Sequence, residues 1–220
     1  MNSNVAVTIT DLNQLSVHEL PLGIKRQGNL DEWWTIFRLV KALVRSDLLS
    51  LPLTICHQGN SFPDFRVKSA SVERGIEITK VAEGDYEEAS SHLKRRNRSL
   101  IVMDKNNPIP LIGDLGALCV AMPNSTEWAE KVLGIIERKA TIAAKSPCNL
   151  SSTSLLVLDR LDWQAYPFRE KCMALVSLLK SKVWDTPPFT HLFVECQYHE
   201  SLIRIDLRTG KWKILRGLND

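Results

Sequence analysis

The stretch SFPDFRVKSASVERGIEITK, residues Ser61–Lys80, decides the fold, because it combines two strand patterns with two carboxylates. The runs DFRVKSA and ERGIEITKV have the composition of short β-strands, and a short polar break separates them, so the sequence predicts a hairpin. In the second run, Glu77 stands between Ile76 and Ile78. A carboxylate within an apolar strand is costly unless it is paired or holds a metal ion.

Asp64 and Glu77 are the candidate metal ligands of this hairpin. Side chains alternate faces along a strand, so Glu77 and Thr79 share the face opposite to the two isoleucines. In an antiparallel pair, Asp64 at the start of the first strand approaches Glu77 on the second, with the backbone carbonyl of Ile78 nearby. Oxygen ligands of this kind suit Mg²⁺ or Mn²⁺. Such an ion favours phosphodiester hydrolysis by activating water and by stabilising negative charge.

Helix and strand patterns alternate along the rest of the chain. Apolar spacing predicts helices over residues 29–49, 125–145 and 170–184, the second capped by Ser125 or Thr126. Residues 84–98 also look helical, because acidic residues come early and basic residues late. The remaining segments are an excursion rich in Pro, Gly and Asn (103–125), a central strand (154–160) and two or three C-terminal strands (191–216). This order predicts an α/β or α+β fold with a mixed sheet.

The tripeptide PDF, Pro63–Phe65, followed by Glu77 in an apolar strand, resembles the restriction-endonuclease-like, or PD-(D/E)xK, nuclease superfamily. The element order over residues 29–160 is similar to the superfamily core of a helix, three strands, a helix and a strand. The resemblance implies an α/β, restriction-endonuclease-like core: a helix, a mixed central sheet and flanking helices. Extra C-terminal strands in residues 161–220 complete one domain that spans residues 1–220.

The resemblance implies a nuclease that depends on Mg²⁺ or Mn²⁺ and hydrolyses phosphodiester bonds of nucleic acid, DNA ahead of RNA. Metal binding falls to Asp64, Glu77 and the carbonyl of Ile78. A homodimer is one option that the resemblance carries, because cutting both strands of a duplex usually needs two sites.

The chain departs from the superfamily pattern at the lysine. The pattern E-x-K predicts lysine at position 79, where this chain has Thr79. Lys80 follows it, but on a regular strand Lys80 faces the other side and needs a bulge to serve. Lys139 or Lys131, both in the helix over 125–145, are the alternative sources of the lysine. The superfamily often uses a further acid from its first helix, and Glu32 is the candidate.

Charge and composition suggest partners and compartment. The run KRRNR offers Lys94, Arg95, Arg96 and Arg98 for phosphate contacts, although a solvated helix end explains it equally well. Five scattered cysteines without a C-x-x-C pair argue against a disulfide framework and a zinc knuckle. No apolar run is long enough to cross a membrane and no signal peptide is recognised, so we expect a cytoplasmic protein.

Two alternatives to a nuclease stay open. One is a degenerate relative that binds nucleic acid or a protein partner without catalysis, because Thr79 replaces the lysine. The other is an interaction protein, such as an immunity or inhibitor factor, in which Glu77 faces solvent. Among the other candidates, His57 is interpreted as a loop histidine, and Trp33, Trp34 and Trp128 as core residues.

Overall fold

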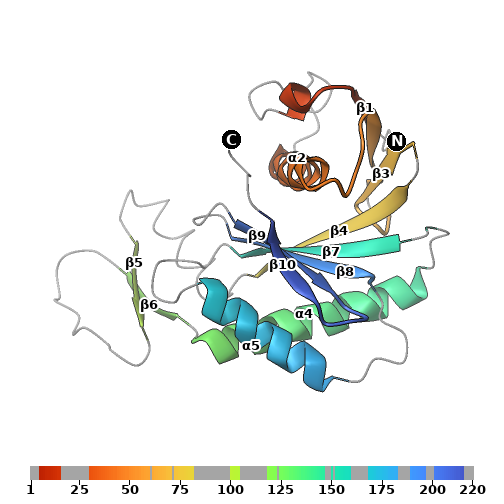
Figure 1. The fold of residues 1–220 in the computed structure, drawn as a ribbon. Helices are drawn as coiled ribbons and strands as arrows, with labels where there is room; N and C mark the ends of the chain where they lie inside the picture. Colours follow the sequence, from red (N-terminus) through yellow and green to blue (C-terminus); the bar gives the residue numbers. More distant parts are fainter. Residues whose placement is uncertain are drawn as a thin grey trace.

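The computed structural model has an α/β architecture, in which a mixed sheet of eight strands is covered by helices on both faces (Figure 1). The structure describes residues 5–15, 30–59, 61–70, 72–81, 100–104, 118–122, 124–146, 150, 152–159, 168–182, 189–196 and 201–215. The described helices are α2 (Leu30–Arg45), α4 (Ser125–Lys145), α5 (Phe168–Ser181) and the short 3-10 helix η1 (Leu12–Leu15). Helix α2 covers one face of the sheet, and α4 and α5 cover the other.

The sheet has the strand order β1-β2-β3-β4-β7-β8-β9-β10. Its strands are β1 (Ala6–Ile9), β2 (Leu53–His57), β3 (Phe65–Ser69), β4 (Glu73–Val81), β7 (Ser152–Asp159), β8 (His191–Cys196), β9 (Ser201–Asp206) and β10 (Trp212–Leu215). Strands β4, β7 and β8 run parallel, whereas the other neighbouring pairs are antiparallel. Parallel neighbours need a crossover, and α4 and α5 lie in the two crossovers. The predicted hairpin, central strand and C-terminal strands are therefore confirmed.

Two hydrophobic layers hold the sheet between its helices. On the α2 face, Phe37 and Val40 belong to one cluster with Ile76 and Ile78 of β4. On the other face, residues of α4 and α5 pack with alternate residues of β4, β7 and β8. Strand β7 contributes to both layers and is buried over its last six residues, as its continuous apolar run predicts.

The N-cap of helix α4 lies just before the two predicted cap residues, although the helix itself, Ser125–Lys145, has the predicted bounds. Asn124 is the N-cap, and its side chain accepts hydrogen bonds from the backbone N–H groups of Thr126 and Glu127. The Glu127 carboxylate in turn accepts from the Asn124 N–H at 3.0 Å. The prediction of Ser125 or Thr126 was wrong, because only Asn124 places a glutamate at the third helical position of a capping box.

Other predictions differ from the structure in detail. Helix α2 ends at Arg45, four residues before the predicted end. Trp33 is buried, but Trp34 is 42% exposed and is not a core residue, because adjacent helical residues point about 100° apart. The predicted excursion begins within β5 (Leu100–Asp104) and contains β6 (Leu118–Met122); the two strands form a parallel pair apart from the main sheet (Figure 1). The predicted helix over 84–98 lies outside the described residues.

Two further observations concern membrane-spanning helices and cysteines. No helix within the described ranges is long and apolar enough to cross a membrane. Cys56 and Cys172 are free thiols.

Gly75 on β4 fixes the turn that carries Asp64. A Cβ atom at Gly75 would lie 2.7 Å from Cγ of Pro63 and 2.8 Å from Cδ1 of Leu150, which is closer than packed carbon atoms approach. Only glycine lets Pro63, the residue before Asp64, pack against the strand at this point.

We expect Gly75→Ala to lower the free energy of unfolding by about 1–3 kcal/mol, because the added methyl group overpacks this contact. Gly134→Ala is the matched control, since a Cβ at Gly134 of α4 meets nothing within 4 Å. That change should raise stability by about 0.5–1 kcal/mol through helix propensity. Urea denaturation measures both, and equal stability of Gly75→Ala and the parent chain would contradict the packing described.

Candidate active site

Asp64 and Glu77 meet where strand β3 begins. Phe65 pairs with Ile76 in the β3–β4 ladder, so the preceding Asp64 comes opposite Glu77. The Asp64 N–H donates to Oε2 of Glu77 at 3.2 Å, and the Ile78 N–H donates to Oδ2 of Asp64 at 2.7 Å. The approach of the two acids that the sequence predicts is therefore present. Glu77 is only 5% exposed, which excludes the interpretation of a solvent-facing glutamate.

The Ile78 backbone completes an oxygen-rich edge. In an antiparallel ladder the N–H and C=O of one residue point to the same neighbouring strand. Since the Ile78 N–H bonds Asp64, its carbonyl is directed to the same side, past the start of β3. Two carboxylates and one carbonyl thus lie on one short stretch of the sheet.

The pKa of Asp64 is raised from 3.8 to about 7, chiefly by burial and next by the negative charge of Glu77. The hydrogen bond from Ile78 and the positive charge of Lys139 act against this rise, whereas Glu32 adds to it. The two carboxylates repel each other in a partly dry setting, where charge interactions are strong. A cation at this point would relieve the repulsion.

Lys139 of α4 provides one such cation. Its Nζ lies 2.6 Å from Oε1 of Glu77. It reaches the face of β4 to which Glu77 and Thr79 belong, so the helix supplies an ammonium group where the strand has threonine. The candidate Lys131 lies eight residues earlier on α4, about 12 Å along the helix axis.

Lys80 lies away from this group. Thr79 pairs with Val157 and Lys80 with Leu158 in an unbroken parallel register, so β4 has no bulge at this position. The Lys80 side chain therefore points to the α2 face, like Ile78. Of the three candidate lysines, Lys80, Lys131 and Lys139, it is Lys139 that the structure places in contact with Glu77.

His57 and Glu32 flank the pair of acids. The prediction of a loop histidine was wrong: His57 ends strand β2 and is 6% exposed, between the rings of Trp33 and Phe65. Its Nε2 lies 3.5 Å from Oε2 of Glu32, which belongs to the first turn of α2. The alternation of Leu53, Ile55 and His57 in LTICH was the signal for an inward-facing histidine.

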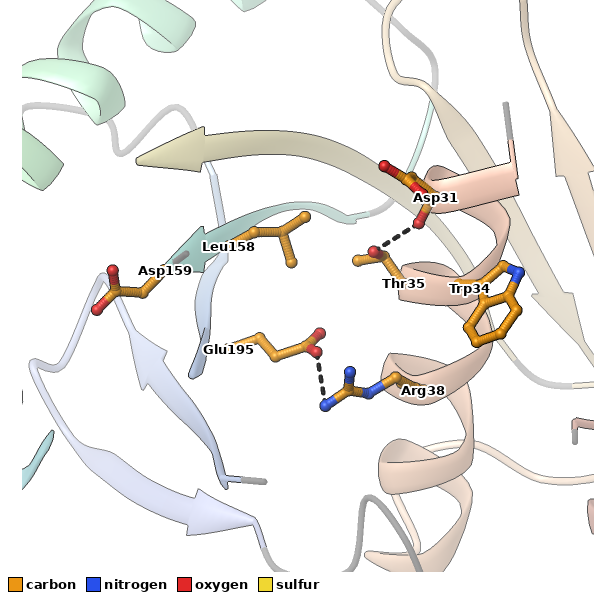
Figure 2. A pocket seen from close by; sticks show the side chains of 7 residues that line it. All are labelled: Asp31, Trp34, Thr35, Arg38, Leu158, Asp159 and Glu195. Atoms are coloured by element: carbon orange, nitrogen blue, oxygen red, sulfur yellow. Dashed lines mark hydrogen bonds and ion pairs between the residues drawn. The ribbon is translucent and has the colours of Figure 1, made fainter. Parts of the chain in front are cut away.

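A second polar group, which the sequence analysis missed, lies where β7 and β8 end (Figure 2). It surrounds a cavity of about 110 Å³ lined by Asp31, Trp34, Thr35, Arg38, Leu158, Asp159 and Glu195. Nη2 of Arg38 lies 2.9 Å from Oε1 of Glu195, and Nζ of Lys171 lies 3.4 Å from Oδ2 of Asp159. In the sequence, this group is indicated by the acids that end two apolar runs, Asp159 in VLD and Glu195 in FVE. Three acids against one lining arginine make this cavity unsuited to phosphate.

Asp64 and Glu77 fit a divalent ion only if the protein supplies part of its ligands and water or substrate supplies the rest. Within the described part of the chain, no group of three or more His, Cys, Asp or Glu side chains is arranged to hold a metal. Mg²⁺, however, commonly binds through one or two carboxylates, with water and substrate phosphate as its other ligands. The raised pKa of Asp64 and the carbonyl of Ile78 fit such an ion.

The basic candidates Lys94, Arg95, Arg96 and Arg98 lie outside the described residues. In comparisons with known proteins, no family model matches the chain, and no curated protein or solved structure is significantly similar to it.

Asp64 makes stability depend on pH. Its pKa in the folded chain, about 7, lies above the ordinary value of 3.8. Its contribution therefore favours folding below about pH 4 and is lost as the pH rises through 7. In a metal-free buffer at pH 8 we expect Asp64→Asn to be more stable than the parent chain, by about 1–3 kcal/mol after screening is allowed for.

The difference should become small at about pH 3 and below, where Asp64 is largely protonated in the unfolded chain as well as in the folded one. Chemical denaturation at the two pH values measures it. Asp47→Asn, which removes an equal charge at an exposed position just after α2, is the control. If the free energies of unfolding of the parent chain and Asp64→Asn differed by the same amount at both pH values, this would contradict the raised pKa of Asp64.

Proposed function

We propose that this chain is a metal-dependent nuclease of the restriction-endonuclease-like, or PD-(D/E)xK, superfamily that hydrolyses phosphodiester bonds of nucleic acid, DNA ahead of RNA. The observation that carries the proposal is the group formed by Asp64, Glu77 and Lys139. Two acids from adjacent strands and one lysine from a crossover helix meet at one point.

The arrangement of elements supports the proposal. Helix α2 is followed by three antiparallel strands, β2, β3 and β4, and, after the separate pair β5–β6, by α4 and by β7 parallel to β4. Apart from that pair, the order is similar to that of the superfamily core, and we assign Asp64, just before β3, and Glu77, on β4, to the acids of its motif. The C-terminal elements from α5 to β10 extend the same sheet.

The chemistry of the group suits phosphodiester hydrolysis. A bound Mg²⁺ or Mn²⁺ lowers the pKa of water and stabilises negative charge on the phosphate and the leaving oxygen. Asp64, Glu77 and the Ile78 carbonyl would hold the ion. Glu77, fixed by the Asp64 N–H, keeps its carboxylate oriented toward Lys139.

We assign Lys139 the role of the lysine in the E-x-K motif. Its ammonium group lies against Oε1 of Glu77, from where it can orient the attacking water and stabilise charge on the phosphate. The charge of Glu32, which contacts His57, adds to the rise in the pKa of Asp64. The cluster from Lys94 to Arg98 is proposed to contact phosphates. We also propose that the enzyme is cytoplasmic and that it acts on DNA as a homodimer.

A second candidate is a catalytically degenerate module that binds nucleic acid or a protein partner. Both carboxylate oxygens of Glu77 already accept hydrogen bonds from the protein, one from Asp64 and one from Lys139. Such an ion pair is also the arrangement expected if the group has become structural. Metal-dependent cleavage separates the two candidates.

We expect the parent chain to cleave DNA in a mixed panel of DNA and RNA when Mg²⁺ or Mn²⁺ is present, and not in EDTA. Glu77→Gln should reduce the rate at least about 100-fold, because it removes a metal-binding charge and keeps the shape. Cleavage that survives in Glu77→Gln would contradict the assignment of the site. Absence of cleavage in the parent chain would favour the degenerate module.

The source of the lysine is tested separately. Lys139→Ala should lower cleavage at least about 100-fold, whereas Lys80→Ala, on the opposite face of β4, should keep it within a few-fold. Thr79→Lys in the Lys139→Ala background places an ammonium group on the Glu77 face and should restore part of the rate. Loss of cleavage in Lys80→Ala with activity retained in Lys139→Ala would overturn this role for the helix.

A further inference from the structure

A group of cationic and hydroxyl side chains, here called the arginine cluster, lies on the α2 face of the sheet, at the edge where β4, β7 and β8 begin. Its members are Arg74, Ser152, Ser154, His191 and Arg204. Each follows the alternation of a strand whose neighbouring inward residues belong to the α2-side core, such as Ile76, Leu156 and Phe193. Four strands that are far apart in the sequence thus contribute to one polar patch.

The strand register brings these side chains together. Arg74 pairs with Ser152 across β4 and β7, and Ser154 pairs with His191 across β7 and β8. Nη2 of Arg204 lies 2.6 Å from Nε2 of His191. Because arginine only donates, Nε2 of His191 accepts, and its Nδ1–H donates to Oγ1 of Thr190 at 3.0 Å.

The cluster gathers positive charge that the described neighbours do not balance. Burial and the charge of Arg204 lower the pKa of Arg74. Burial and the two arginines lower the pKa of His191 to about 4, so the imidazole is neutral at pH 7. The nearby acid is Asp206, whose carboxylate accepts backbone N–H bonds in the turn after β9. Two guanidinium groups therefore lie close enough to interact electrostatically, beside a neutral histidine.

Several buried donors of the cluster have no hydrogen-bond partner among the described residues. They are Nε and Nη1 of Arg74, Nε of Arg204, and the hydroxyls of Ser152 and Ser154. Ser154 is completely buried. Buried polar groups in proteins are nearly always hydrogen-bonded, and leaving them unmet is costly. Unpaired guanidinium N–H groups beside hydroxyls that can donate are a set of groups that an anion can satisfy.

We propose that the arginine cluster binds an oxyanion of the phosphate class, with the dianionic form of a phosphate monoester or free phosphate as its ligand. The guanidinium groups of Arg74 and Arg204 match the oxygens of phosphate in charge and in planar fork geometry. The hydroxyls of Ser152 and Ser154 donate to the remaining oxygens. Two positive charges fit a dianion better than the single charge of a phosphodiester.

The cluster is separate from the candidate active site. Arg74 precedes Glu77 by three residues on β4, about 10 Å along the strand, and faces the other side of the sheet. The proposal therefore goes beyond the nuclease activity and does not depend on it. Two sources have the required chemistry: the terminal phosphate of a nucleic-acid strand and free inorganic phosphate.

The test is a calorimetric titration of the full chain with inorganic phosphate, in EDTA and at constant ionic strength. We expect saturable binding of one phosphate per chain. Arg74→Gln and Ser154→Ala should each weaken it at least about tenfold, because each removes a donor to a charged ligand. Arg169→Gln, an equal charge change at an exposed position of α5 on the other face, should leave the affinity unchanged.

Folding of the variants is checked by thermal unfolding without phosphate. Arg74→Gln and Ser154→Ala remove groups that the described residues leave unmet, so both should unfold no earlier than the parent chain. Absence of saturable phosphate binding, or equal weakening by Arg169→Gln, would overturn the proposal. So would variants that are destabilised while phosphate binding persists.

Oligonucleotides with a 5′-phosphate or a 5′-hydroxyl distinguish the two sources. Binding in EDTA that is at least tenfold tighter for the phosphorylated strand, and equal for both strands in Arg74→Gln, identifies a terminal phosphate. Equal binding of both strands by the parent chain, together with saturable inorganic phosphate, identifies the free ion. Neither outcome requires cleavage, so failure of the nuclease assignment and failure of this site are separately visible.

Discussion

The contact between Asp64 and Glu77 is the constraint on which the rest of the site depends. The backbone fixes this contact. The β3–β4 register brings the two residues together, and the backbone N–H groups of Asp64 and Ile78 hold the two carboxylates in place. Burial of two like charges is unfavourable and is visible in the raised pKa of Asp64. A protein that keeps such a pair needs a cation close to it.

Lys139 is the cation that the fold itself supplies. Helix α4 crosses from β4 to β7 over the face that carries Glu77, so a lysine on its inward side reaches the carboxylate without distorting the strand. A strand lysine at position 80 would need a bulge, and the parallel ladder with β7 excludes one because its pairing is continuous. The two requirements, a regular central sheet and a cation beside Glu77, are met together by placing the lysine on the helix.

Much of this arrangement follows from local sequence patterns. The hairpin, the buried strand β7 and the helices have strong periodicity, and the two acids follow from the hairpin register. The choice between Lys80 and Lys139 did not follow, because it depends on how α4 crosses the sheet. His57 was misjudged since Gln58 and Gly59 after it suggest a loop. The arginine cluster escaped notice because its members come from four strands whose side-by-side order only the tertiary fold defines.

Strand β4 directs Glu77 toward the proposed cation site and Arg74, on the opposite face, toward the proposed anion site. The central claim concerns the first of these. A crystal structure of the chain with Mn²⁺, read from anomalous scattering, tests it most directly. The account predicts a manganese ion bound by the carboxylates of Asp64 and Glu77 and by the carbonyl of Ile78. A manganese ion bound elsewhere, with the Lys139–Glu77 pair unchanged, would contradict it.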